Sequence, residues 1–274
     1  MITVVKALWI RNLKVFVRNK PALIFSLAFP FFFVFVFSGI FGNAAMMLAG
    51  IIISTVFDAS LRISSNTIDD MTGGFMKEVL VSPVSRFTIA LGQFTSSATV
   101  STVQGFIIYV IGFFMGLRPD SAWTVIAATL SMVFVGFIFA GFGLLIACKS
   151  KNMQTFQAVS MAITMPMTFI SGAYIPLSRL PVPLQWVGRF NPMTYAVHFF
   201  RESVMDIRGE DVDALLAAEQ AILTFGNLVI TPFLSIIILA VFGAIFLLLS
   251  TITFTNVDFS KMHRNKVDAA DFWG

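Results

Sequence analysis

Four polar side chains recur at helical spacing inside an otherwise apolar stretch of the sequence. They are Gln93, Ser97, Ser101 and Gln104, at positions i, i+4, i+8 and i+11, so they share one face of a helix. In apolar surroundings, amide and hydroxyl groups either hydrogen-bond neighbouring helices or line a polar path between them. Bonding between helices is the commoner use, and both interpretations stay open here.

Met161 and Met165 lie about one helical turn apart in the run MAITMPMTF. Methionine side chains adapt to many shapes, so they suit a wall that an apolar or amphipathic solute slides along. Such clusters more often face lipid or the core of a helix bundle. We therefore keep them as candidate pathway residues, together with the polar face from Gln93 to Gln104.

Motifs for enzymatic chemistry do not occur in the sequence. His198 and His263 are the only histidines, and neither H-E-x-x-H nor G-x-S-x-G is present. Without a Gly-Lys dipeptide there is no phosphate-binding loop of the G-x-x-x-x-G-K-[ST] kind. The single cysteine, Cys148, excludes an internal disulfide and is expected to be a buried thiol. We expect no enzyme, no catalytic residue, and no metal or cofactor on this chain.

The composition is that of an integral membrane protein. Of the 274 residues, 57% are hydrophobic and only 12% are charged, which is far from the balance of a soluble globular domain. The net charge of +4 does not indicate nucleic acid, because the basic residues cluster beside apolar runs, where they set membrane topology. We expect the lipid bilayer as surroundings and no nucleic-acid partner.

Apolar runs of about 20 residues predict the helices that position these side chains, because that length crosses a bilayer. The first uncharged run is too long for one helix and contains the turn sequence SGIFGN, which predicts a hairpin. The predicted spans are residues 22–41, 44–63, 88–117, 122–148, 152–174 and 225–253. The sequence thus predicts an all-α membrane protein with six transmembrane helices in a single domain, residues 1–274.

The charges predict how these spans are oriented. With both termini in the cytoplasm, all eight lysines and half of the ten arginines fall on the cytoplasmic side of the cell membrane. Residues 1–20 alternate apolar and basic positions at helical spacing, which is typical of an amphipathic helix in the membrane interface. We call this expected helix the elbow helix, because Pro21 would then turn the chain into the membrane.

Asp58 and Arg62 are opposite charges one helical turn apart in the second predicted span. Charged side chains are costly inside a bilayer and are usually paired there. We therefore expect an ion pair between them that holds the inner end of this span at the interface.

The largest cytoplasmic loop between spans contains a short predicted helix at residues 72–83. Two glycines precede it, a proline ends it, and its apolar side chains share one face. It is either a docking element that inserts into a groove of another protein or a surface helix that caps its own bundle. The residues expected to carry docking are Phe75, Met76, Lys77, Glu78, Leu80, Pro83 and Arg86.

Residues 175–224 are too apolar for an ordinary loop and too interrupted by proline and charge for a span. The stretch 190–200 is about half a span long. We expect Asn191 to cap a short helix whose first residue is Pro192. The rings expected at the level of the lipid headgroups are Tyr174, Trp186 and Tyr195.

Two motifs carry a resemblance to a known family. One is EVLVSPVSR at residues 78–86, and the other follows the pattern SG…P…LP…NP-x-T-Y at residues 171–195. With the elbow helix and six spans, the chain resembles over nearly all its length the permease subunits of type 2 ATP-binding-cassette exporters, most closely the daunorubicin-resistance and multidrug permeases. Gly73 and Gly74 depart from the more charged ERGT-like sequence frequent in that family.

The resemblance implies that residues 72–83 are a coupling helix that contacts a separate ATPase subunit, which would bind ATP and Mg. It also implies a homodimer with spans 1 and 5 at the interface. The cargo would be an apolar or amphipathic solute, such as a drug, a lipid or a lipid-linked glycan. The rival is an ion-coupled secondary transporter of a hydrophobic solute, which usually shows ionisable residues near the midplane and two related halves.

For residues 175–224, the resemblance implies short re-entrant helices that dip into the outer leaflet and gate release. The alternative is an amphipathic segment that only anchors the chain in the outer interface. The residues expected to form the gate are Gly172, Pro176, Pro181, Asn191, Pro192 and Tyr195.

Overall fold

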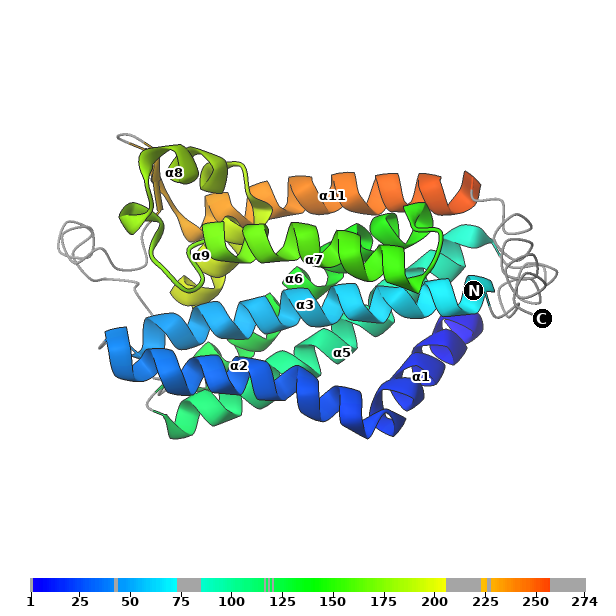
Figure 1. Cartoon of the computed structure of the whole chain (residues 1–274), viewed down its shortest axis with the longest axis horizontal. Coiled ribbons are helices and arrows are strands. Elements are labelled where there is room, and N and C mark those ends of the chain that lie inside the picture. Colours follow the sequence, from blue (N-terminus) through cyan, green and yellow to red (C-terminus); the bar gives the residue numbers. More distant parts are fainter. Residues whose placement is uncertain are drawn as a thin grey trace.

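The structure is a computed structural model that describes residues 2–41, 44–72, 85–115, 117, 119, 121–205, 223–225 and 228–256. Long helices lie side by side along the longest axis, and α1 is set at an angle to them (Figure 1). Ile2 and Asn256 lie at one end of the bundle, and α8 and α9 lie at the other. The helices are α1 Ile2–Arg18, α2 Lys20–Phe41, α3 Ala44–Thr72, α5 Arg86–Phe114, α6 Ala122–Lys149, α7 Met153–Ile170, α8 Val182–Arg189, α9 Pro192–Met205 and α11 Pro232–Asn256.

Four helices in the described part of the chain are long and apolar enough to cross a membrane: Met47–Asp70 within α3, then α5, α6 and α11. The stretches Val5–Arg18 and Leu23–Phe33 meet at 81° and make a fifth span if they are counted together. This is therefore a multi-span membrane protein with four to five candidate spans. Of the six predicted spans, residues 152–174 form the shorter helix α7, whose glutamines lower its hydropathy.

The described residues form an all-α fold, as predicted, apart from one short extended segment. Strands β1 (Leu223–Phe225) and β2 (Leu228–Ile230) form an antiparallel pair just before α11. The last span was predicted from residue 225, but α11 begins at Pro232. Pro232 suits the first position of a helix, and Thr231 Oγ1 accepts a hydrogen bond from the backbone N–H of Leu234 at 3.3 Å.

Helix α3 lies at the centre of the fold and continues to Thr72, beyond the predicted end at residue 63. In its polar last part, hydroxyl groups hydrogen-bond carbonyls of the same helix, as Ser64 Oγ does with the carbonyl of Ser60 at 3.2 Å. Phe57 packs edge to face on Phe139 of α6, with ring centroids 4.5 Å apart. The core is therefore built around α3, and α11 lies at the periphery with 22% of its apolar window buried.

Candidate functional site

The predicted docking residues Phe75, Met76, Lys77, Glu78, Leu80 and Pro83 lie outside the described residues, so their role stays a prediction. Arg86, which ends that loop, is described. Its Nη1 donates to the carbonyl of Thr255 and, at 3.4 Å, to that of Phe254. The last carbonyls of a helix lack partners within the helix and carry partial negative charge, so a guanidinium suits them. Arg86 thus ties the end of the loop to the carboxyl end of α11.

The start of the same loop is tied to α1. Asp70, near the end of α3, is 3% exposed and accepts hydrogen bonds from both terminal nitrogens of Arg11, with Nη1 at 2.8 Å from Oδ2. Such two-point pairing of a guanidinium with a carboxylate is strong and fixes orientation. The sequence reasoning missed this pair, since the two residues are 59 positions apart. The available signal was an acidic residue at the end of a span and a basic residue on the elbow helix.

The polar face of α5 packs between helices. Its four side chains from Gln93 to Gln104 are all buried. Gln93 Oε1 accepts from Asn12 Nδ2 of α1 at 2.8 Å, and Gln104 Oε1 accepts from Arg62 Nη2 of α3 at 3.2 Å. A Cβ on Gly136 of α6 would lie 2.3 Å from Ser101 Oγ, so α6 closes directly over that hydroxyl. These contacts favour helix packing over an open path along this face.

The expected pairing of Asp58 with Arg62 is confirmed only as an attraction between their charges. Among the described residues the two make no direct ion pair, and Arg62 Nη2 donates to Gln104 Oε1 of α5. The i, i+4 spacing permits a pair, but α5 offers an amide oxygen to the arginine from the neighbouring helix. The Arg62 side chain therefore makes its hydrogen bond between helices and interacts with Asp58 within α3 only through charge.

Met161 and Met165 lie on the outer surface of α7, where they are 63% and 50% exposed. They line an open, apolar groove of about 500 Å³, in which Pro166 and Phe169 are further neighbours. Two residues of α7, Phe156 and Thr168, are buried in this chain. In a single copy the methionines therefore face outward and do not line an interior path.

The six predicted gate residues lie in one compact unit of turns and short helices that runs from Gly172 to Tyr195, at the start of α9. We call it the turn unit. Gly172 has a φ of +83°, a left-handed conformation that favours glycine. Pro176 precedes a three-residue 3-10 helix, Leu177–Arg179, and Pro181 precedes α8. The prolines thus begin short helical turns, where their missing N–H is not needed.

The second half of this unit confirms the predicted helix cap. Helix α9 begins at Pro192, and Asn191 Oδ1 accepts from the backbone N–H of Met193 at 3.0 Å. Asn191 also donates through Nδ2 to the carbonyl of Met167 at 2.6 Å, which joins α9 to α7. Tyr195 is buried and donates to the carbonyl of Arg189 at 2.6 Å, so it holds the turn and is not presented to lipid. The gating role of these residues stays a prediction.

Arg201 fastens the unit to the core of the bundle. This guanidinium, 6% exposed, donates to the carbonyls of Gly172 at 2.8 Å and Ala173 at 3.1 Å. A Cβ on Gly50 of α3 would lie 2.0 Å from the same Ala173 oxygen, so only glycine permits this approach. In the sequence, Arg201 directly follows the apolar stretch 190–200, and nothing local in the chain indicates this contact.

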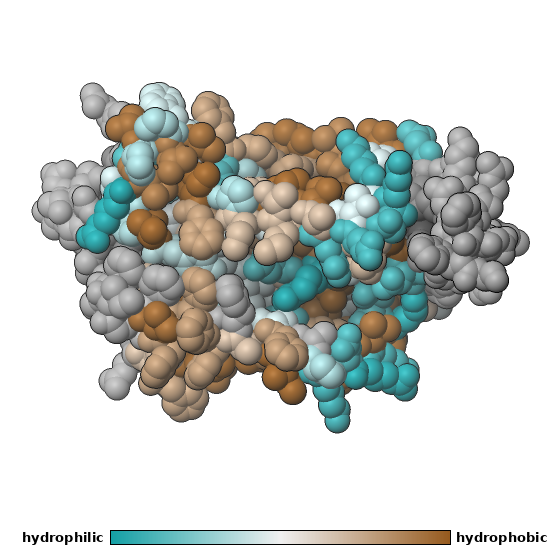
Figure 2. All heavy atoms as spheres, in the orientation of Figure 1, coloured by the Kyte–Doolittle hydropathy of each residue, from teal (hydrophilic) through white to brown (hydrophobic). Residues whose placement is uncertain are grey.

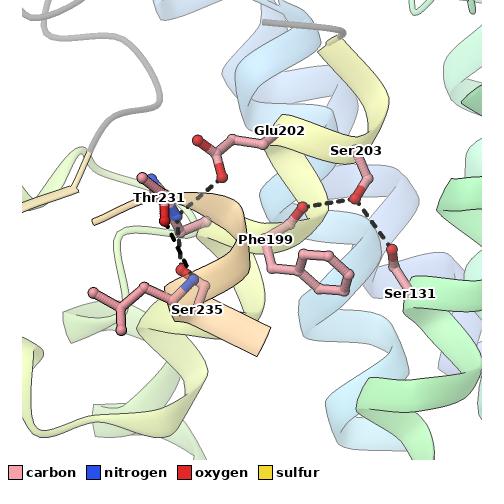
Figure 3. A network of polar contacts seen from close by, with 8 residues as sticks. Ser131, Phe199, Glu202, Ser203, Thr231 and Ser235 are labelled. Atoms are coloured by element: carbon pink, nitrogen blue, oxygen red, sulfur yellow. Dashed lines mark hydrogen bonds and ion pairs between the residues drawn. The ribbon is translucent and has the colours of Figure 1, made fainter. Parts of the chain in front are cut away.

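A buried cluster of ionisable and hydroxyl groups joins α9 to α11 and α6 (Figure 3). His198 Nδ1 lies 3.0 Å from Ser235 Oγ and 3.4 Å from Glu202 Oε2. On another face of α9, Ser203 meets Ser131 of α6, with their Oγ atoms 3.2 Å apart (Figure 3). Burial, and secondly the charge of Arg201, lower the pKa of His198 to about 4.

The sequence analysis did not predict this cluster, although one pattern in the sequence indicates part of it. His198, Arg201 and Glu202 stand at i, i+3 and i+4, a spacing that puts them on one helix face. The described residues contain no group of three or more His, Cys, Asp or Glu side chains that could hold a metal ion. The hydrogen bonds of His198 to Ser235 and of Ser131 to Ser203 make the cluster a junction between helices.

Comparisons with known proteins agree with this architecture. The profile of the ABC-2 type transporter family matches residues 3–205, which include the predicted loop and the turn unit. A putative transport permease, ycf38, of Cyanophora paradoxa is 26% identical over 206 residues, which cover 70% of this chain and 71% of that protein. The inner membrane transport permease YadH of Escherichia coli strain K12 is 25% identical over 157 residues, covering 57% and 60%. Because the family profile covers well over half of its length, the chain belongs to the ABC-2 type transporter family of membrane permeases.

Proposed function

We propose that this chain is the transmembrane subunit of an ATP-driven exporter that moves an apolar or amphipathic solute out of the cytoplasm. The observation that carries the proposal is the family match over residues 3–205. A drug, a lipid or a lipid-linked glycan would each suit such a subunit. The resemblance to the daunorubicin-resistance and multidrug permeases makes a drug-like solute one candidate.

ATP and Mg would be bound by a separate ATPase subunit, because this sequence has no Gly-Lys dipeptide and therefore no phosphate-binding loop of its own. The loop at residues 73–84 would contact that subunit and be displaced when the subunit changes conformation. Its two ends support this role, since Asp70 is fixed to α1 and Arg86 to the carboxyl end of α11. A displacement of the loop would therefore move packed helices rather than bend a free segment.

Two copies of the chain would enclose the path for the solute. The apolar groove beside Met161 and Met165 supports this arrangement, because it lies open on α7 in a single copy. By family resemblance, α2 and α7 would face the second copy. The turn unit from Gly172 to Tyr195 would then stand at the outer end of the path, as a gate.

The test is co-purification of the full chain with its ATPase from native membranes. Replacing Phe75 with Ala and Glu78 with Lys should lower recovery of the ATPase about tenfold or more, since buried docking contacts are each worth on the order of 1 to 3 kcal/mol. A matched control, Phe114→Ala with Lys151→Glu, also removes one ring and reverses one charge, at exposed positions outside the loop. Equal recovery with both double variants would refute docking through this loop.

One observation favours a second candidate, a proton-coupled transporter. His198 and Arg201 are buried, and the Glu202 side chain beside them is 12% exposed. Proton-coupled carriers use ionisable clusters of this kind. The two candidates differ in their energy source. Transport in proteoliposomes that continues without ATP and stops when the pH gradient is collapsed would favour the proton-coupled transporter. Transport that stops without ATP and continues without a pH gradient would favour the ATP-driven exporter.

A further inference from the structure

Helix α1 is placed so that it can lie along a membrane surface. The stretches Val5–Arg18 and Leu23–Phe33 meet at 81°, nearly a right angle. When the apolar α2 runs across the bilayer, α1 must therefore run close to the membrane plane. Figure 2 shows hydrophilic residues gathered at the end of the molecule where α1 lies and apolar residues over the middle of the same face.

One face of α1 is fixed to the protein. Leu8 is 6% exposed and packs against Gly92, where an added Cβ would lie 3.0 Å from Leu8 Cδ1. Trp9 Nε1 donates to Thr99 Oγ1 at 2.9 Å, and Asn12 is bonded to Gln93. These contacts with α5 prevent the helix from rolling, so its other face points away from the bundle in a set direction.

That other face holds a groove of about 360 Å³ lined by Ala7, Ile10, Arg11, Lys14, Val15 and Arg18. Asp70 neutralises Arg11, so Lys14 and Arg18 supply the positive charge of the groove. Both are exposed, and neither forms an ion pair with another described residue. Ile10 and Val15, 36% and 43% exposed, lie beside them.

We propose that this groove binds the headgroup of an anionic phospholipid from the cytoplasmic leaflet. The phosphate would sit against Lys14 and Arg18, and the glycerol and first methylenes would cover Ile10 and Val15. Basic side chains near a membrane surface attract anionic lipids, and apolar neighbours add burial that a soluble anion does not supply. The combination of cationic and apolar lining favours a lipid over free phosphate.

The test is native mass spectrometry of the full chain released from nanodiscs of phosphatidylglycerol or phosphatidylcholine. Wild type should retain phosphatidylglycerol in preference to phosphatidylcholine. Lys14→Gln with Arg18→Gln should weaken phosphatidylglycerol binding at least fivefold, whereas Lys6→Gln with Lys149→Gln removes two exposed charges outside the groove and should leave it unchanged. Thermal unfolding in detergent verifies that all three proteins are folded.

Three outcomes would overturn the proposal. Equal losses in the two double variants would mean that only the overall charge matters. Equal retention of the two lipids by wild type would remove the preference for an anionic headgroup. Displacement of the bound lipid by millimolar inorganic phosphate would show that the groove binds phosphate from any source and is not a lipid site.

Discussion

At the scale of single residues, two arginines make contacts that their positions in the sequence do not indicate. Arg201 borders an apolar stretch, yet it donates to two backbone carbonyls in the turn that follows α7. Arg62 stands one turn from an aspartate, yet it bonds Gln104 of another helix. Both guanidinium groups donate to oxygen acceptors on a neighbouring element. For Arg201, which is buried, a lack of such partners would be costly.

His198 makes stability depend on pH. Burial lowers its pKa to about 4 in the folded chain, against an ordinary value of 6.5. Below pH 6.5 the unfolded chain therefore binds a proton that the folded chain does not bind until about pH 4, so stability falls as the pH drops through this window. Between pH 7.5 and pH 5 the loss should be about 2 kcal/mol.

Thermal unfolding of wild type and His198→Gln at these two pH values measures this effect. Glutamine stays neutral, so the variant should lose less of its melting temperature on acidification than wild type does. His263 lies outside the described residues, and His263→Gln serves as the control that keeps the buried histidine. Identical acid shifts in wild type and His198→Gln would contradict the expectation.

At the scale of elements, the helices on either side of the predicted docking loop are fixed by charge. Arg11 of α1 holds Asp70 of α3, and Arg86 at the start of α5 holds the carboxyl end of α11. Helices α3 and α5 also pack closely against each other. At Gly105, α5 lies so near Val56 of α3 that an added side chain would not fit. The loop therefore connects two elements that already belong to one packed body.

A comparison of a single variant with a double variant tests the contact between α1 and α3. Arg11→Ala leaves the buried carboxylate of Asp70 without its guanidinium, whereas Arg11→Ala with Asp70→Ala removes both charges. The single variant should therefore be less stable than the double variant, by on the order of 1 kcal/mol. Thermal unfolding in one detergent compares them, with Lys14→Ala as a matched loss of charge from α1. If the double variant is the less stable one, Asp70 is stabilised by other groups.

At the scale of the whole molecule, the turn unit and the two described ends of the chain lie at opposite ends of the helix bundle. The turn unit with α8 and α9 lies at one end, and Ile2 and Asn256 lie at the other (Figure 1). Exposed basic residues such as Lys149 and Lys151 flank the span α6 at its carboxyl end. Because basic residues stay on the cytoplasmic side, we expect the turn unit to face outward.

Labelling of single cysteines tests this orientation. In a Cys148→Ser background, Ser178→Cys should react with a membrane-impermeant maleimide in intact cells, since Ser178 is exposed beside α8. Lys151→Cys should react only after the membrane is permeabilised. Unmodified Cys148→Ser protein is the control for background reaction. Reaction of Lys151→Cys in intact cells would mean that the chain is inserted the other way round.

The sequence by itself determined the features that depend on residues close together in the chain. Apolar runs predicted a membrane protein with long helices, and the Asn191-Pro192 pair predicted the start of α9. The break after Phe41 and the start of α6 at Ala122 were predicted as well. These features follow from hydropathy, helix capping and turn residues, which act within a few positions of one another.

Only the tertiary structure decided which polar groups meet. Gln93 and Gln104 share a helix face in any arrangement, but the close approach of α1, α3 and α6 made that face a packing surface rather than an open wall. Arg11 pairs with Asp70, which stands 59 positions later in the chain. The last span begins at Pro232 because the strand pair precedes it. Such pairings depend on how helices dock, and no local pattern in the chain encodes the choice of neighbour.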